Sequence, residues 1–324
     1  MSSTAHPGAR AGLAALALVL AGAAACSADV APGDAVGPLD AAPETLHLGR
    51  VHLIIQPSLT TPEEDEPALE VTARFIQFRG VDEGFVRSSF DLIAPVHERL
   101  ATGDCVPTDA LEELTAYEFG EPQEDGEDAL REILLLDAGN IRVNLGELRF
   151  DLGLTLVPDL LPYVAGVEYV HTLDAIDGFL PGEADAIAIE VEGAGDDELP
   201  GFTHLADMPT ALDLRDASGS FDRDTLTLRW RENQRSGDRA LPITLRLTSL
   251  SSAAVTGREL TCLVPDTGEA RLNLRELSEL GLGGAGDVLM VEARRVAVTR
   301  FEAGEFADGE VIVEVRDRYR TYLR

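Results

Sequence analysis

The chain of 324 residues contains no lysine, since all 26 of its basic residues are arginine. Without an ε-amino group it cannot form a Schiff base, a Walker A phosphate loop or a Ser-x-x-Lys nucleophile. Aromatic residues make up only 5% of the chain, with Trp230 the sole tryptophan. This argues against a sugar-binding surface built from exposed aromatic rings. The histidines also lack metalloprotease spacing, and no Gly-x-Ser-x-Gly or Gly-x-Gly-x-x-Gly motif occurs.

Basic residues are outnumbered by 58 aspartates and glutamates, which gives a formal net charge of -32. A polyanion would be repelled, so nucleic acid is excluded as a general partner. The charge is uneven: residues 27–200 hold 38 acidic residues against 8 arginines, whereas residues 201–324 hold 20 against 17. This step supports a division into two domains.

Cysteine is scarce, and the first of the three cysteines indicates where the protein is located. An apolar run follows Arg10 and ends at Cys26, which is typical of a secretory signal peptide over residues 1–25. The cysteine makes it resemble a bacterial lipoprotein signal, in which that residue is acylated. Ala23 stands where lipoprotein signals usually carry leucine, and Ala23 to Ala25 also satisfy the Ala-x-Ala cleavage rule. Lipidation at Cys26 is the prediction, and plain secretion is the alternative.

Residues 26–44 are small, acidic and punctuated by proline and glycine, which is typical of a flexible tether. With an acylated Cys26, such a tether would hold the folded part at a membrane of the cell envelope. Ser27 after the cysteine favours the outer membrane, so the membrane is an expected partner through the lipid anchor.

The other two cysteines, Cys105 and Cys262, are candidates for a disulfide in an oxidising compartment. Cys262 lies in an apolar alternating segment, whereas Cys105 lies in the loop-like Thr-Gly-Asp-Cys-Val-Pro sequence. Two unrelated buried thiols are the alternative.

Alternation of apolar and polar residues predicts an all-β fold with little helix. We expect two β-sandwich-like domains over residues 45–207 and 208–324, separated by proline and glycine near 200–209. The second has about seven short strands with an inward-facing Trp230, and it resembles an immunoglobulin or fibronectin type III sandwich. The strand segments are 68–79, 132–145, 184–192, 226–230, 243–247, 259–264, 269–274, 288–299 and 310–319, and the short helical candidates are 111–117, 157–164 and a turn near Leu277 and Leu280.

Two segments repeat a pattern: 137–145 and 266–274 share Asp, Gly, Arg, Asn and Leu at equivalent positions. Each is expected to form a hairpin turn followed by a strand. Either the two domains are duplicates or similar hairpins use similar turn residues.

The same repeat supplies the candidate catalytic residues, Asp137 and Asp266. Asp266-Thr267-Gly268 resembles the active-site loop of aspartic peptidases, in which two carboxylates share a proton. Pro265, Ala138 and Glu269 depart from that pattern. An aspartic-type hydrolase is therefore kept as the alternative function.

One polar segment spaces acidic side chains as a hard cation would need. Asp216, Asp222 and Asp224 form a weak candidate calcium site. The segment lacks the glycine and glutamate of an EF-hand, and a polar loop is the alternative. We expect no cofactor, and calcium is the one candidate.

The second half also resembles a group of exported lipoproteins of GC-rich Gram-negative bacteria, loosely over residues 131–324. The resemblance depends on Pro200-Gly201-Phe202, Pro209, 226–230, 262–268 and the Leu277/Leu280 pair. It implies a secreted β-rich lipoprotein and supplies no activity. We therefore expect a non-enzymatic binding or scaffold protein whose partner is an envelope or extracellular protein or a glycan.

Overall fold

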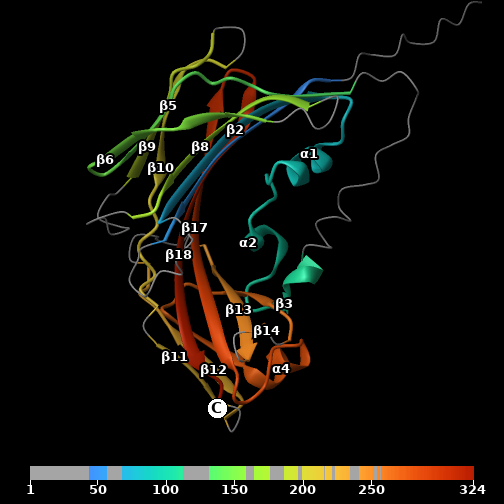
Figure 1. Cartoon of the computed structure of the whole chain (residues 1–324), viewed down its shortest axis with the longest axis vertical. Coiled ribbons are helices and arrows are strands. Elements are labelled where there is room, and N and C mark those ends of the chain that lie inside the picture. The colour runs from blue at the N-terminus through green and yellow to red at the C-terminus, as the bar shows by residue number, and fades with distance from the viewer. Residues whose placement is uncertain are drawn as a thin grey trace, which may run out of the picture. The chain divides into compact units, whose positions relative to one another are not determined.

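A computed structural model describes residues 44–56, 68–111, 131–157, 164–175, 186–195, 199–214, 216–220, 223–233, 241–251, 254–255 and 257–324 (Figure 1). Its strands are β1 (Leu46–Ile55), β2 (Leu69–Arg79), β3 (Cys105–Pro107), β4 (Glu132–Leu135), β5 (Ile141–Leu145), β6 (Leu148–Asp151), β7 (Gly153–Leu156), β8 (Val164–Leu173), β9 (Ala186–Val191), β10 (Phe202–Asp207), β11 (Asp216–Ser220), β12 (Thr225–Arg229), β13 (Ile243–Ser251), β14 (Ala254–Val255), β15 (Leu260–Val264), β16 (Glu269–Asn273), β17 (Val288–Ala303) and β18 (Phe306–Tyr322). Its helices are α1 (Glu83–Ser89), α2 (Val96–Arg99) and α4 (Leu274–Glu279). The expected all-β fold is confirmed.

The strands form three sheets. The long sheet has eleven strands in the order β3-β15-β13-β17-β18-β1-β2-β4-β8-β7, with β14 paired to β13. Smaller sheets have the orders β10-β9-β5-β6 and β11-β12-β16. Most pairs in the long sheet are antiparallel, but β1 pairs in parallel with β18, and β4 with β8. Strands β1 and β18, the first and last among the described residues, are thus neighbours within the sheet.

The long sheet buries one face in two hydrophobic cores. Along β18, the alternate residues Val311, Val313 and Val315 belong to the first core. Tyr319 continues the same alternation into the second core, as does Leu323 just after the strand ends. The four-stranded sheet contributes to the first core and the three-stranded sheet to the second. This is the sandwich-like packing of sheet faces that alternating strands predict.

The chain passes from the first core to the second between Met208 and Leu212, near the predicted boundary at 207/208. The hairpin of β17 and β18 nevertheless contributes to both cores, and the described residues form one compact unit. Separate domains at this boundary, and an immunoglobulin or fibronectin type III topology, stay predictions.

The two expected hairpins at the repeat are wrong. Between β4 and β5, the turn at Asp137 carries the chain from the long sheet to the four-stranded sheet. Between β15 and β16, the turn at Asp266 carries it to the three-stranded sheet. Gly139 and Gly268 have φ angles of +68° and +82°, which favour glycine. The sequence therefore predicted the two turns correctly. It could not distinguish a hairpin from a connection between two sheets, which we call an arch, because both need the same turn residues.

Helices α1 and α2 were not expected from the sequence. Asp82 begins α1 by accepting a hydrogen bond from the backbone N–H of Phe85 at 3.0 Å, as an N-cap residue does. Val86 and Phe90 then face the protein at helical spacing. The helical turn expected near Leu277 is present as α4, with Leu277 buried. Most of the candidates 111–117 and 157–164 lies outside the described residues.

Because β17 and β18 serve both cores, we predict that the cores unfold together. Replacing Leu53→Ala opens a cavity in the first core and should cost about 2–5 kcal/mol. Trp230 belongs to the second core, so its fluorescence reports unfolding there. The urea midpoint from Trp230 fluorescence should fall as far as the midpoint from far-UV circular dichroism. An unchanged Trp230 midpoint would instead show two independently folding domains.

Candidate functional site

A long connection, which we call the strap (residues 80–108), crosses the long sheet on the face opposite the cores. It leaves the end of β2 and returns as β3, which pairs with β15 at the sheet edge. Strands β1, β18, β17 and β13 lie between β2 and β15, so the strap passes over them (Figure 1).

The first part of the strap is held by packing and by two arginines. Helix α1 covers an apolar patch on β1, β2, β4 and β8. Arg50 donates from Nη1 to the carbonyl oxygens of Asp91 and Ile93, at 3.3 and 2.9 Å. Arg74 donates to the carbonyl oxygen of Phe90 at 2.6 Å. Both guanidinium groups also pair with glutamates, Arg50 with Glu310 and Arg74 with Glu168. These hydrogen bonds therefore fix residues 90–93 of the strap to the long sheet.

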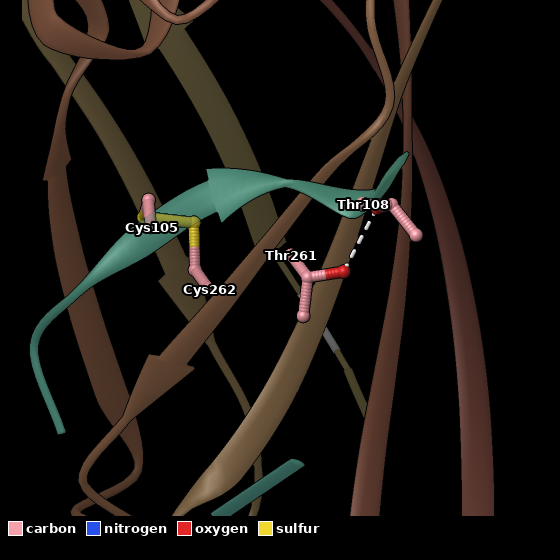
Figure 2. Close-up of a disulfide and its surroundings, with 4 residues drawn as sticks. All are labelled: Cys105, Thr108, Thr261 and Cys262. Atoms are coloured by element: carbon pink, nitrogen blue, oxygen red, sulfur yellow. Dashed lines mark hydrogen bonds between the residues drawn. A yellow bond between two sulfur atoms is a disulfide. The ribbon is translucent and has the colours of Figure 1, made fainter. Parts of the chain in front are cut away.

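The far end of the strap is fixed by the disulfide between Cys105 and Cys262, which lie directly opposite each other on β3 and β15. Figure 2 shows this bond beside the hydroxyl contact of Thr108 and Thr261, whose oxygens are 2.9 Å apart. Cys105 thus belongs to a strand, where the sequence indicated a loop. The bond closes a sequence separation of 157 residues.

The face of the long sheet that the strap crosses carries several arginine side chains. We call these the arginine face: Arg246 on β13, Arg294 on β17, and Arg316, Arg318 and Arg320 on β18. Cross-strand register places Arg246, Glu292 and Arg318 in one row and Thr244, Arg294 and Arg316 in the next. These residues alternate with core residues such as Val291 and Ala293. Alternation on three neighbouring strands therefore gathers five arginines on one surface.

Two buried glutamates hold the arginine face together. Glu292 accepts from Arg318 Nε at 2.7 Å and from Arg294 Nε at 2.6 Å. Glu314 pairs with Arg316 and, at 3.5 Å, with Arg294 and with His52 Nε2. Only 8% of each glutamate side chain is exposed. Each carboxylate is thereby shared between two guanidinium groups.

Both glutamates remain ionised in this setting. Burial works against the charged form of Glu314, but His52, Arg294 and Arg316 outweigh it and hold its pKa far below the usual value. Burial likewise opposes the charge of Glu292, and the nearby arginines lower its pKa overall. Their contribution to stability is therefore present above the unfolded pKa and is lost as the pH falls.

The arginine face contrasts with the charge of the whole chain. Its five arginines face Glu292, Glu314 and Glu259, the last bonded to Arg246 at 2.7 Å. Arginine is therefore concentrated on one surface of a chain with a net charge of -32. It was missed by sequence reasoning, although Arg316, Arg318 and Arg320 alternate visibly in the segment already predicted as a strand.

Asp266 forms a buried ion pair with Arg295 beside the second core. Arg295 Nε donates to its Oδ2 and Arg295 Nη2 to its Oδ1, both at 2.8 Å. Trp230 Nε1 also donates to Oδ1, at 2.9 Å. The side chains of Arg295 and Asp266 are 2% and 0% exposed. Arg295 also donates hydrogen bonds to the backbone carbonyls of Thr210, Ala211 and Arg231. All three nitrogens of its guanidinium group are therefore hydrogen-bonded.

Asp137 occupies the matching arch beside the first core. Tyr169 donates its hydroxyl to Asp137 Oδ1 at 2.5 Å, and the N–H of Gly139 donates to the same oxygen at 2.8 Å. These hydrogen bonds lower the pKa of Asp137, the one from Tyr169 most. Among the described residues no hydrogen bond or ion pair joins Asp137 to Asp266. The two carboxylates instead brace two separate arches.

The other candidates are only partly described. Asp222 and the side chain of Asp216 lie outside the described residues, as does Cys26. Asp224 lies 3.5 Å from Arg275 Nη2. In the part of the chain that the structure describes, no three His, Cys, Asp or Glu side chains are grouped to hold a metal ion. No helix in those ranges is long and apolar enough to cross a membrane.

Comparison with known proteins adds little to this geometry. No family model and no curated protein matches the chain. Among solved structures, the Fcho1 mu homology domain of Danio rerio with a bound Eps15 peptide is similar, with 9% identity, 88% of this chain and 98% of that chain covered, and a TM-score of 0.23. At that TM-score the likeness carries no argument about fold or function.

The disulfide should stabilise the folded state substantially. Replacing both cysteines by serine, Cys105→Ser with Cys262→Ser, should lower the free energy of unfolding by about 2–5 kcal/mol, because a long loop in the unfolded chain is no longer closed. Urea denaturation of the double variant and of the wild type with and without reductant measures this. Equal stability of the oxidised and reduced wild type would contradict the prediction.

Replacing each of the two aspartates by asparagine should lower the free energy of unfolding by different amounts. Asp266→Asn leaves Arg295 buried without a counter-charge and should cost about 3–5 kcal/mol. Asp137→Asn weakens hydrogen bonds at an exposed carboxylate and should cost about 1 kcal/mol. Urea denaturation followed by far-UV circular dichroism compares them. Equal losses would show that the ion pair has no special importance.

Proposed function

We propose that the protein is a lipid-anchored binding or scaffold protein of the cell envelope, without enzymatic activity of its own. The signal sequence and Cys26 motivate the anchor, and residues 26–44 supply the tether. A disulfide at Cys105–Cys262 suits an oxidising compartment outside the cytoplasm.

The arginine face is the observation that carries a binding role. Five arginines from three adjacent strands form an ordered surface in a strongly acidic chain. Arginine presents its N–H groups as a rigid fork that matches carboxylate and phosphate groups. Such a surface suits recognition of an anionic partner. The former catalytic candidates are engaged elsewhere, Asp266 with Arg295 and Asp137 with Tyr169.

Anchoring is tested by expressing the chain with its own signal and measuring the mass of the mature N-terminus. We expect acylated Cys26 and recovery with membranes, and we expect Cys26→Ser to release the protein from them. An unmodified N-terminus at or beyond Cys26 would contradict the anchor.

Binding is tested by cross-linking in intact cells. The anchored wild type should give a defined cross-linked product with an envelope component, and an anchored control protein of similar charge should not. The absence of any such product would contradict a binding role.

A further inference from the structure

We propose that strand β7, at one end of the long sheet, binds an extended segment of a basic partner protein, which adds to the sheet as a further strand. The segment has apolar side chains on alternate residues and basic residues at its flanks. This inference goes beyond the proposed function, because β7 lies several strands away from the arginine face. It depends on the outward backbone groups of β7, on two exposed leucines and on the charge of the chain.

The backbone of β7 presents hydrogen-bonding groups to an open edge. Among the described strands β7 pairs only with β8, and their antiparallel register continues to Val157, whose N–H donates to the carbonyl oxygen of Gly166 at 3.2 Å. Hydrogen-bonded and non-hydrogen-bonded pairs alternate along such a ladder. Thr155 therefore points its N–H and C=O groups towards β8, as Val157 does. Leu154 and Leu156 point theirs away from β8, and within the described ranges these groups have no hydrogen-bonding partner.

The side chains of β7 carry an apolar surface to the same edge. Leu154 and Leu156 are 51% and 74% exposed. They lie opposite Tyr169 and Val167 on β8, which pack in and against the first core. Residues directly opposite each other on neighbouring strands share one face of the sheet. The apolar face of the long sheet therefore continues beyond the core onto two leucines that an added strand would cover.

The composition of β7 differs from that of the other terminal strands. Exposed edges are usually protected from pairing by charged residues or by proline. The strands at the other ends of the three sheets contain Pro107 on β3, Asp151 on β6, Asp207 on β10, Asp216 on β11 and Glu269 on β16. Strand β7 has the sequence Gly-Leu-Thr-Leu, without charge or proline. It therefore permits the strand addition that the other edges discourage.

Charge distinguishes a basic partner from a second copy of this chain. Residues 27–200, which include β7, hold 38 acidic residues against 8 arginines. A second copy would bring the same excess of negative charge to the edge, and the two copies would repel each other. A segment with basic flanks is instead attracted to this half of the molecule. Its outward N–H and C=O groups pair with those of β7, and its alternate apolar side chains cover Leu154 and Leu156.

The test uses the mature chain and the fluorescent peptide Lys-Lys-Val-Thr-Val-Thr-Val-Lys-Lys. Fluorescence anisotropy measures its dissociation constant at physiological salt. A valine opposite Leu154 points its N–H towards β7, so the same peptide with N-methylated valines keeps the charge and loses these donors. It should bind at least about tenfold more weakly, a loss of roughly 1.4 kcal/mol. A peptide with glutamate in place of lysine should be weakened at least as much, because the chain repels it.

One substitution blocks the edge without removing a hydrogen bond to β8. Leu156→Pro removes an outward N–H group, and proline is tolerated where the N–H of an edge strand faces solvent. It should raise the dissociation constant at least about tenfold. A matched control, Leu205→Ser with Tyr322→Ser, removes side chains that are 65% and 66% exposed on other strands. The control should change the dissociation constant less than about twofold, and an unchanged value for Leu156→Pro would overturn the proposal.

Circular dichroism checks that Leu156→Pro is folded. If it is not, Leu154→Ser with Leu156→Ser carries the test, because both side chains are exposed and the backbone groups remain. Loss of the two apolar side chains should weaken peptide binding at least about fivefold. An unchanged dissociation constant for this double variant would equally overturn the proposal.

Two further results would also overturn it. Equal binding of the N-methylated and unmodified peptides would show attraction by charge without strand addition. A dimer of the mature chain that forms with rising concentration and is abolished by Leu156→Pro would show that a second copy occupies the edge. Sedimentation velocity of the wild type and of Leu156→Pro measures this, and we expect both to be monomers.

Discussion

The pairing of β17 with β18 is the constraint on which the rest of the structure depends. The register runs from Val288 opposite Tyr322 to Ala303 opposite Phe306. One face of this hairpin contributes to both hydrophobic cores, and the other face presents arginines and glutamates. Each residue on these two strands must therefore suit a core or an ion pair according to its position. A shift of one residue would exchange the two faces.

Carboxylates are buried on both faces of this hairpin, and on each face they are paired with arginine side chains. Arg295 and Asp266 join β17 to the arch after β15, and backbone carbonyls accept the remaining N–H groups of Arg295. On the opposite face, Glu292 and Glu314 are each shared between arginines. Buried ion pairs gain little net stability compared with apolar packing, but losing one partner is costly. They therefore specify one arrangement more than they stabilise it.

Sequence patterns predicted most strands, because alternation directly reflects a sheet with one buried face. Ala68–Arg79 and Ile243–Leu247 are examples, each with its apolar residues in a core. Which strands pair could not be predicted, since Asp-x-Gly turns serve hairpins and arches alike. The partner of Asp266 was equally hidden, because Arg295 is 29 residues away and adjacent to Arg294. Only the fold determines which of these two arginines faces the core.

The parallel pairing of β1 with β18 has a consequence for folding. Arg50 on β1 and Glu310 on β18 lie opposite each other, although 260 residues separate them in the sequence. Because synthesis runs from the N-terminus, one edge of β1 has no native partner until β18 has been made. An unpaired edge strand invites pairing with other chains. A chain cut before Phe306 would therefore expose one edge of β1 in the middle of the long sheet.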